Sequence, residues 1–446
     1  MDRFELAGLA TEIGKLRMSR VAGRVHAVDS NIVWVSGLTN LLSVSDRVQI
    51  TQNSGRKLFA EVLRLSDQGA GVMVEGPLSG ISIGDRVTQW SNISLRPNLG
   101  WIGRVIDPDG QPLDGRPIPV SEDATSIRTV SPMSRRGLGE RLKTGLAVFD
   151  TFLPLAQGQR IGVFAGSGVG KSRLLAQLTR GINVDVVVVA MVGERSREIR
   201  DFVQNVLGSE GMAKSIVVAA SSERPALERR RCARSAMEIA EYFRDQGKQV
   251  LYLADSLTRM AEAHRDIAFS AGELPVLQGF PPSMPAELMG LCERAGPGGE
   301  GQGDITAVFT VLVAGSDMEE PVADVLRGTL DGHVILDREI AERGRFPAID
   351  ILRSVSRSLP EAASEPENDL LTHARRLLGQ YEKIEPMMRA GLYREGADPR
   401  IDEAVVAWPE LDSFVSDKSV SGHEQSFAKL NLILRRAAAG TIKAAS

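Results

Sequence analysis

Residues 165–172 are Ala165-Gly166-Ser167-Gly168-Val169-Gly170-Lys171-Ser172, and this stretch decides the fold of the chain. A short, apolar, β-prone run, 160–164, comes directly before it, and residues 172–180 place apolar side chains three and four positions apart. The glycines leave room for consecutive backbone N–H groups to turn toward one centre. A strand, a glycine-rich turn and a helix in this order therefore predict a loop that binds phosphate groups.

The polar residues of the loop have distinct expected roles. Lys171 is expected to reach the β- and γ-phosphates of a nucleotide, and Ser172 to place its hydroxyl on Mg²⁺. The other loop residues, with Arg173 after them, complete the predicted nucleotide-binding set. Ala165 stands where the usual pattern has glycine, so this position must accept a methyl group. The three glycines are evenly spaced and lead straight into a lysine, which differs from a dinucleotide-binding fingerprint.

Length and composition limit the class of protein. A chain of 446 residues favours two or three domains. Hydrophobic residues make up 43% and charged residues 25%, which is typical of soluble globular proteins. The formal net charge of −4 argues against a surface that binds nucleic acid throughout. Because the N-terminus lacks a continuous apolar region and the longest apolar runs are too short to cross a bilayer, a cytoplasmic protein is expected.

Cysteine and histidine usage limits the metal chemistry. Only Cys232 and Cys292 are present, far apart, which fits a reducing compartment without disulfides. The five histidines lack the spacing of a zinc site. Any bound metal is therefore expected to be Mg²⁺ carried with the nucleotide.

The pattern along the chain predicts four segments. Residues 1–20 are expected to form an amphipathic helix, which either packs on its own domain or docks a partner. Residues 21–95 carry short β-rich runs broken by turn residues, which is the pattern of a small β-barrel. Over 96–365, apolar strands alternate with helices, as in a mostly parallel sheet covered on both faces. Residues 366–446 are predicted to form a helical domain.

Some individual elements follow from the same pattern. A helical stretch is predicted over 195–207, and residues 97–132 are predicted to be a loop-rich connection. In the last segment, the pattern predicts separate helices over 369–381, 387–392, 402–406 and 424–439.

Two acidic residues follow apolar strands, at the edge where a parallel sheet presents its ligand site. Asp255 is predicted to hold the shell of Mg²⁺, although an acidic residue in this place is also common as a helix cap. Glu194 is the candidate for polarising the attacking water, and the alternative is a solvated loop glutamate.

Further motifs occur in a fixed order after the loop. They are Gly193-Glu194-Arg195-Ser196-Arg197-Glu198, Asp255-Ser256-Leu257-Thr258-Arg259, Gly279–Ser283, Glu293–Gly296, Asp331–His333 and Phe346–Asp350. Together they resemble the ATPases of type III protein export, which are relatives of the catalytic subunit of rotary ATP synthase. The resemblance covers nearly the whole chain. It implies a RecA-like P-loop ATPase core between a β-barrel and a helical domain.

The resemblance also implies roles for particular residues. Glu194 becomes the catalytic carboxylate with Arg195 beside it, and Asp255 the acidic Mg²⁺ residue. Phe346 is expected to stack on the adenine ring of ATP, with a packed core aromatic as the alternative. Arg357 matches the arginine finger of the family, which would act in the site of a neighbouring subunit. A salt-bridged arginine is the alternative there, with Arg353 as the residue most easily mistaken for the finger.

The implied function is ATP hydrolysis by a homo-hexamer that energises the export of flagellar proteins, by unfolding them or releasing them from chaperones. The implied partners are a stator-like negative regulator bound by the N-terminal helix, a central stalk-like protein, membrane proteins of the export gate and chaperone–substrate complexes. Nucleic acid is not expected. The expected place is the cytoplasm, at the inner-membrane face of the flagellar export apparatus.

Other functions remain open from the sequence. Within the family, these are the ATPase of a virulence injectisome and the catalytic subunit of a rotary ATP synthase. A non-catalytic ring subunit would lack Glu194 or Arg357, and both are present. A hexameric RNA helicase would want a basic barrel studded with aromatic residues, which 21–94 does not supply.

Overall fold

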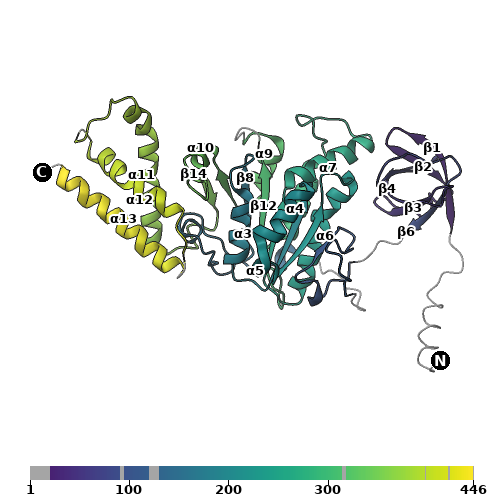
Figure 1. The fold of residues 1–446 in the computed structure, drawn as a ribbon, viewed down its shortest axis with the longest axis horizontal. Coiled ribbons are helices and arrows are strands. Elements are labelled where there is room, and N and C mark those ends of the chain that lie inside the picture. The colour runs from purple at the N-terminus through teal and green to yellow at the C-terminus, as the bar shows by residue number, and fades with distance from the viewer. Residues whose placement is uncertain are drawn as a thin grey trace, which may run out of the picture. The chain divides into compact units, whose positions relative to one another are not determined.

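The structure is a computed structural model, and it describes residues 21–90, 95–119, 130–313, 318–396, 398–419 and 422–444, with side chains up to 439. The amphipathic helix expected at 1–20 lies outside the described residues. Contacts divide the chain into two compact units, one built around the β-strands that precede residue 91 and one containing the remaining sheet and most of the helices. Each is described by itself below (Figure 1).

The first unit is a closed barrel, as the sequence predicts. Its strands pair in the order β1-β2-β5-β4-β3-β6, and the pairing of β1 with β6 closes it. Alternate side chains point inward, so Val33, Val35, Val48, Ile50 and Val72 form a core with no exposed surface. The strand bounds are β1 Ala22–Asp29, β2 Ile32–Ser36, β3 Arg47–Thr51, β4 Lys57–Ser66, β5 Gly69–Val74 and β6 Arg86–Trp90.

The second unit contains an eight-stranded sheet in the order β14-β13-β8-β12-β11-β9-β10-β7. All neighbours are parallel except the hairpin of β13 and β14. Every residue of β9, β10 and β11 is buried, which explains their continuous apolar sequences. The bounds are β7 Val105–Ile106, β8 Arg160–Ala165, β9 Val186–Val192, β10 Ser215–Ala220, β11 Val250–Asp255, β12 Ile305–Leu312, β13 Gly332–Leu336 and β14 Ile349–Ser356.

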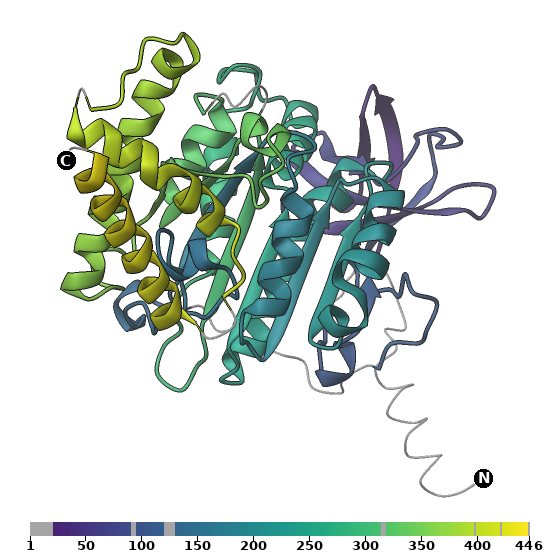
Figure 2. The same cartoon turned by 60° about the vertical axis from the view of Figure 1, so that its left-hand side comes forward.

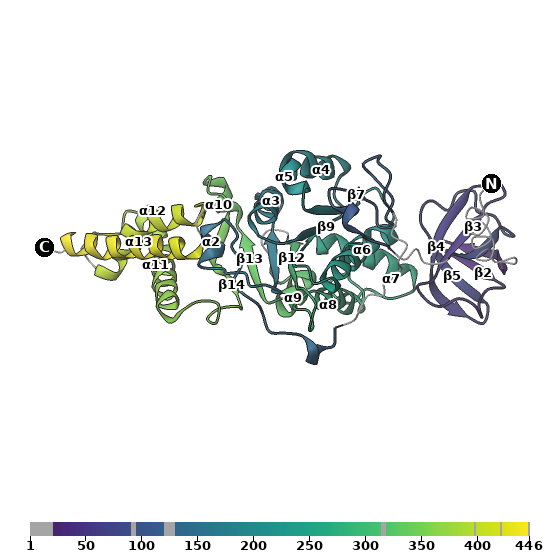
Figure 3. The ribbon, with the colours of Figure 1, turned by 90° about the horizontal axis from the view of Figure 1, so that it is seen from below.

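Helices cover both faces of this sheet. Figure 3 shows α3, α4 and α5 on one face, and α6, α7, α8 and α9 on the other. Their bounds are α3 Lys171–Gly181, α4 Ser196–Asp201, α5 Gly208–Met212, α6 Ala226–Asp245, α7 Leu257–Ser270, α8 Met284–Arg294 and α9 Pro321–Thr329. Two short helices, α2 Ala147–Asp150 and α10 Arg338–Glu342, flank the sheet edge that carries β14. The predicted α/β architecture is confirmed.

The structure adds detail to two local predictions in this unit. The helical stretch expected over 195–207 is confirmed as α4 followed directly by a π-helical segment, Phe202–Leu207. Gly208 then takes a positive φ of 63°, which a right-handed helix does not accommodate. The loop-rich connection after residue 97 also contains β7, which extends the sheet by pairing with β10.

The last three helices are longer than predicted: α11 Glu365–Arg389, α12 Pro399–Val415 and α13 His423–Ala444. The sequence pattern predicts a break in α11 before Pro386 and an end of α12 before Pro409, but both prolines lie inside the helices. Proline weakens an isolated helix, but buried side chains along both helices, such as Leu377, Ile384 and Leu411, anchor them by tertiary packing. The three helices lie side by side (Figure 2). Their core is continuous with the one beneath α3.

No helix among the described residues is both long enough and apolar enough to cross a membrane.

Candidate nucleotide-binding site

The predicted phosphate loop lies between β8 and α3. Ala165 is the last residue of β8 and is buried, with no positive φ, so its methyl group is accepted where the usual pattern has glycine. Gly168 and Gly170 take positive φ values of 80° and 92°, which side chains other than glycine rarely adopt. Gly170 precedes the first residue of α3, Lys171. The positive end of α3 therefore faces the centre of the loop.

A pocket of about 980 Å³ opens over this loop. Its walls come from the loop, from residues after β9, from the start of α7 and from the end of β12. The sequence-predicted residues that line it are Ala165, Gly166, Ser167, Gly168, Gly170, Lys171, Ser172, Arg173, Glu194 and Arg195. Val169 is buried beneath the loop and packs in the core. The structure thus brings Glu194 and the loop together, although 22 or more residues separate them in sequence.

Lys171 is held by two carboxylates at the carboxyl edge of the sheet. Its Nζ donates a hydrogen bond to Asp255 Oδ1 and lies 3.7 Å from Glu194 Oε1. Asp255 closes β11 and is 1% exposed, and it also accepts a 2.7 Å hydrogen bond from Thr310 Oγ1 on β12. Two neighbouring strands therefore fix the Asp255 carboxylate, which is more than a helix cap requires.

Glu194 has a strongly perturbed acidity. Burial raises the pKa of Glu194 to about 7, because the charged form loses solvation, although the nearby Lys171 ammonium opposes the rise. The negative charge of Asp255 and a hydrogen bond with Glu198 raise it further. A carboxyl group that titrates near neutrality is suited to exchange a proton with a bound reactant. The alternative of a freely solvated loop glutamate does not fit this burial.

Glu198 belongs to one of the sequence motifs, although the motif alone predicts no role for it. It lies on α4, lines the large pocket and forms the hydrogen bond with Glu194. It also lines a second pocket of about 130 Å³, which extends between Ser172, Asp255 and Phe202. The available signal was its position in the first turn of the helix that begins directly after Glu194 and Arg195.

A third pocket of about 310 Å³ lies on the other side of the loop. Phe346 lines it, 40% exposed, and its ring approaches Gly170 so closely that a Cβ there would lie 3.2 Å away. Arg173 borders both this pocket and the large one. Ser416 and Lys418, from the end of the α12 region, complete the wall. No sequence signal pointed to these two residues, because they are more than 240 positions from the loop.

The two candidate finger arginines have different surroundings. Arg357 follows β14, is exposed and donates one side-chain hydrogen bond, of 3.3 Å, to the carbonyl of Arg327. It is not among the residues that line the pocket over the loop of its own chain. The guanidinium of Arg353 pairs with Asp337 and Asp350 at 2.5 Å each. Arg357 is thus the freer of the two side chains. Arg195, beside Glu194, is 82% exposed and lies 4.0 Å from Glu198.

The donor set fits a magnesium ion that is bound together with phosphates. No group of three or more His, Cys, Asp or Glu side chains that could hold a metal occurs among the described residues. Mg²⁺ typically uses one or two protein ligands and completes its shell with phosphate oxygens and water. Ser172 and the buried Asp255 lie on the same pocket and supply such a partial set.

Family comparisons assign the class of this fold and site. The description "ATP synthase alpha/beta family, nucleotide-binding domain" matches residues 145–356. The barrel domain of the same family matches residues 18–89, and "T3SS EscN ATPase C-terminal domain" matches residues 363–431. The matched ranges follow the three parts of the fold described above.

Individual relatives indicate the branch of the family to which this chain is similar. A flagellum-specific ATP synthase of Caulobacter vibrioides is 41% identical over 96% of this chain and 99% of its own length. One from Salmonella typhimurium is 42% identical over 93% of this chain and 92% of its own length. A type 3 secretion system ATPase of Xanthomonas euvesicatoria is 38% identical over 95% and 97%.

Solved structures agree with these relatives. The assembled ATPase EscN of the enteropathogenic E. coli type III secretion system superposes with a TM-score of 0.85 at 33% identity, covering 92% of this chain and all of that chain. EscN in complex with its central stalk EscO gives a TM-score of 0.81 at 34% identity, with the same coverage. The chain belongs to the flagellum-specific and type III secretion branch of the ATP synthase alpha/beta family. The predicted family, fold class and ATPase activity are confirmed.

Proposed function

We propose that this protein hydrolyses ATP as a subunit of a homo-hexamer that energises type III export of flagellar proteins. The observation that carries the proposal is the nearly full-length similarity to flagellum-specific relatives, in a chain that keeps a phosphate loop, a buried Asp255 and a perturbed Glu194 in one pocket. An ATPase of this branch needs all three features.

The chain's own residues divide the work at the reacting phosphate. Backbone N–H groups of the loop and Lys171 bind the phosphates, and Ser172 with Asp255 would hold Mg²⁺, which neutralises charge on the β- and γ-phosphate oxygens when bound. Glu194 orients the attacking water and accepts its proton, which the pKa near 7 permits. Arg195 supports the developing charge beside Glu194. Phe346 packs against the adenine ring at the smaller pocket.

Arg357 completes the site of a neighbouring subunit. Its exposed side chain and its absence from the wall of its own pocket support this assignment. A heterologous interface repeated around a closed ring presents each Arg357 to the next pocket. An arginine placed against a transferring phosphoryl group accelerates hydrolysis by about 10³–10⁵. Assembly is then part of catalysis, and activity per subunit rises with protein concentration.

The export function implies several partners. EscN was solved assembled and in complex with a central stalk, and a comparable stalk-like protein is proposed here. A stator-like negative regulator at residues 1–20, export-gate membrane proteins and chaperone–substrate complexes complete the proposal, which includes no nucleic acid. The protein is proposed to work in the cytoplasm, peripherally bound to the inner membrane at the export apparatus, by unfolding substrates or releasing them from chaperones.

The injectisome ATPase is the second candidate. It is supported by the type 3 secretion relative at 38% identity and by the EscN structures. The C-terminal family match at 363–431 favours this branch over a rotary ATP synthase subunit.

Gene deletion tests the proposal, with complementation by wild type and by Lys171→Ala. We expect the deletion to abolish motility and filament-protein secretion, wild type to restore both, and Lys171→Ala to restore neither. Full motility in the deletion strain would refute the flagellar assignment. If the deletion instead abolishes secretion of proteins exported by an injectisome, the second candidate is supported. ATPase activity of the purified protein that depends on added RNA would refute the whole assignment.

A further inference from the structure

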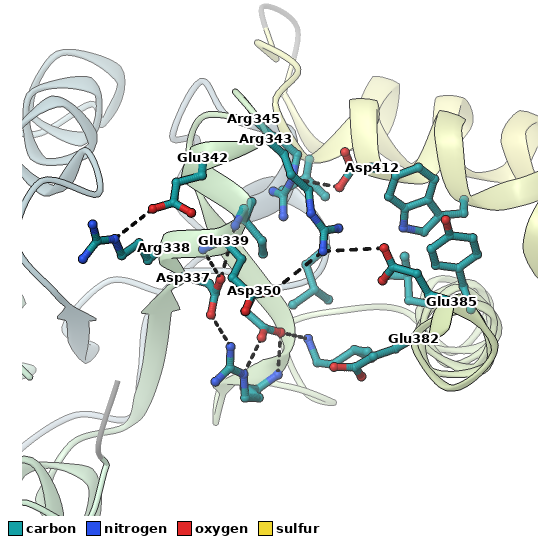
Figure 4. A pocket seen from close by; sticks show the side chains of 18 residues that line it. Asp337, Arg338, Glu339, Glu342, Arg343, Arg345, Asp350, Glu382, Glu385 and Asp412 are labelled. Carbon is teal, nitrogen blue, oxygen red and sulfur yellow. Dashed lines mark hydrogen bonds and ion pairs between the residues drawn. The ribbon is translucent and has the colours of Figure 1, made fainter. Parts of the chain in front are cut away.

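The segment 343–347 separates two pockets and contributes residues to both. Gly344 and Phe346 line the pocket of about 310 Å³ beside the phosphate loop. Arg343 and Arg345 line a different pocket of about 600 Å³, walled by α10, β14, α11 and α12 (Figure 4). The chain turns here, because Arg343 is helical, with φ −75° and ψ −4°, and Gly344 takes a positive φ of 83°. The Arg345 side chain and the Phe346 ring enter different pockets. Contacts that hold the arginines in the pocket of about 600 Å³ therefore also position Phe346 in the pocket of about 310 Å³.

Arg345 is the anchor of this segment. Its side chain is only 10% exposed. Its guanidinium donates hydrogen bonds to the carbonyls of Pro347, at 3.1 Å, and Ile349, at 2.8 Å, and its Nε lies 2.8 Å from Asp412 Oδ1 on α12. The planar guanidinium thus joins the backbone directly after Phe346 to the helical domain, a geometry that lysine does not reproduce.

The helix that holds Arg345 also builds the wall facing Phe346. Asp412 lies on α12, which ends at Val415, and the next residues include Ser416 and Lys418 of the smaller pocket. Tyr381 of α11 and Trp408 of α12 stack in the pocket of about 600 Å³ that Arg345 lines, with ring centroids 4.4 Å apart and an interplanar angle of 13°. The stack ties α12 to α11, so a shift of the helical domain displaces Asp412 and the pocket wall together.

We propose that Arg345 is a positioning residue for the adenine base. By clamping the segment after Phe346 to Asp412, it lets the helical domain set the affinity for the base without touching the phosphates. This inference rests on the proposed function, in which ATP binds with its base against Phe346. It adds that base affinity is controlled from α12, which begins more than 50 positions after Phe346 in the sequence.

Arg343 provides a matched control within the same segment. It lines the same pocket, but its side chain is 42% exposed, and its ion pairs with Glu385 and Glu339 are longer, at 3.6 and 4.0 Å. Exposed pairs of this length contribute little. Removing Arg343 therefore removes a similar charge from the pocket without releasing the clamp on Phe346.

The test compares two ligands that share the phosphates and differ in the base. KM and kcat for MgATP and the inhibition constant of magnesium tripolyphosphate are measured for wild type, Arg345→Ala, Arg345→Lys, Asp412→Asn and Arg343→Ala. For Arg345→Ala we expect KM to rise about tenfold, within the range found when a base loses its aromatic partner. Its kcat and its tripolyphosphate inhibition should stay within about twofold of wild type.

The other variants sharpen the result. Arg345→Lys keeps the charge facing Asp412 but loses at least one of the two hydrogen bonds to carbonyls, so its KM for MgATP should also exceed that of wild type. Asp412→Asn should raise KM less than Arg345→Ala does. Arg343→Ala should leave KM unchanged. An unchanged KM in Arg345→Ala, or an equal loss of tripolyphosphate affinity, would overturn the proposal. If Arg345→Ala does not fold, Asp412→Asn decides by the same criteria. Phe346→Ala distinguishes failure of this proposal from failure of the proposed function. If KM rises in Phe346→Ala but not in Arg345→Ala, only the positioning role of Arg345 is overturned. If the wild-type protein does not hydrolyse ATP, the proposed function itself is overturned.

Discussion

The two sides of the nucleotide site are built in different ways. Within one chain the phosphate side is largely local: β8, the loop and the start of α3 are consecutive in sequence, and Asp255 and Glu194 join them from the ends of two neighbouring strands, β11 and β9, of the same sheet. The proposed base side is assembled from distant parts, namely α3, the segment after α10 and the end of α12. Its key aromatic, Phe346, is 40% exposed, and an arginine fixes the backbone after it to another domain.

This contrast suggests a division of labour. A rigid sheet edge fixes catalytic geometry, because small errors there strongly reduce the rate. A pocket wall contributed by another domain varies with the position of that domain, so it is suited to control how tightly the nucleotide binds. Variants on the phosphate side should therefore act on turnover, and variants on the base side on affinity.

The largest expected effect comes from Arg357→Ala. Loss of the finger should reduce kcat of the assembled protein by about 10³–10⁵, with little change in ATP affinity. Steady-state kinetics at concentrations that form the ring check this result. Arg353→Ala is the matched control, because Arg353 is paired with Asp337 and Asp350 of its own chain. If Arg353→Ala abolishes turnover and Arg357→Ala does not, the two assignments must be exchanged.

Glu194→Gln should reduce kcat by about 10²–10⁴, the usual contribution of a positioned general base, while ATP still binds. Equilibrium binding of a fluorescent ATP analogue, measured beside turnover, checks both parts. Glu320→Gln, which removes a carboxylate from the wall of the same pocket, is expected to have little effect. Weak binding with normal turnover in Glu194→Gln would contradict the role given to this residue.

On the base side, Phe346→Ala should raise KM for ATP by roughly 5- to 100-fold, corresponding to about 1–3 kcal/mol for one base stacked on an aromatic ring. Turnover at saturating ATP should change little, since the phosphate side is intact. KM and kcat for ATP and GTP check this, and we expect KM to rise for both nucleotides, because every base can stack on an aromatic ring. A fall in kcat with unchanged KM would show that Phe346 supports catalysis instead.

The smallest predicted effect is a pH dependence on the phosphate side. The pKa of Glu194 is raised to about 7, and its role requires the deprotonated form. Below that pH the protonated form accumulates, so kcat/KM should fall about tenfold per pH unit and level off above it. Rate profiles between pH 5.5 and 9 would show the slope, with the residual activity of Glu194→Gln as the control. A flat acid limb in wild type would contradict this assignment.

The phosphate side and the base side also differ in how well the sequence predicts them. The loop, Glu194, Asp255 and the barrel were predictable because each depends on residues close together in the chain or on a strand-end position. The α12 residues of the base pocket were not, because only tertiary packing brings Ser416 and Lys418 to the loop. Pro386 and Pro409 misled the helix prediction for the same reason: packing of α11 and α12 overrides the local preference. Glu198 was readable from its position in the first turn of a helix and was missed.

The central claim is that each phosphate site is finished by the neighbouring subunit, and mixing two inactive variants tests it most directly. Glu194→Gln and Arg357→Ala are purified separately, combined in equal amounts as dilute subunits and assembled together. In a ring with random order, roughly a quarter of the interfaces join an intact Glu194 to a neighbour's intact Arg357. We predict that the mixture recovers roughly that fraction of wild-type ATPase activity. A mixture no more active than either variant alone would contradict the account.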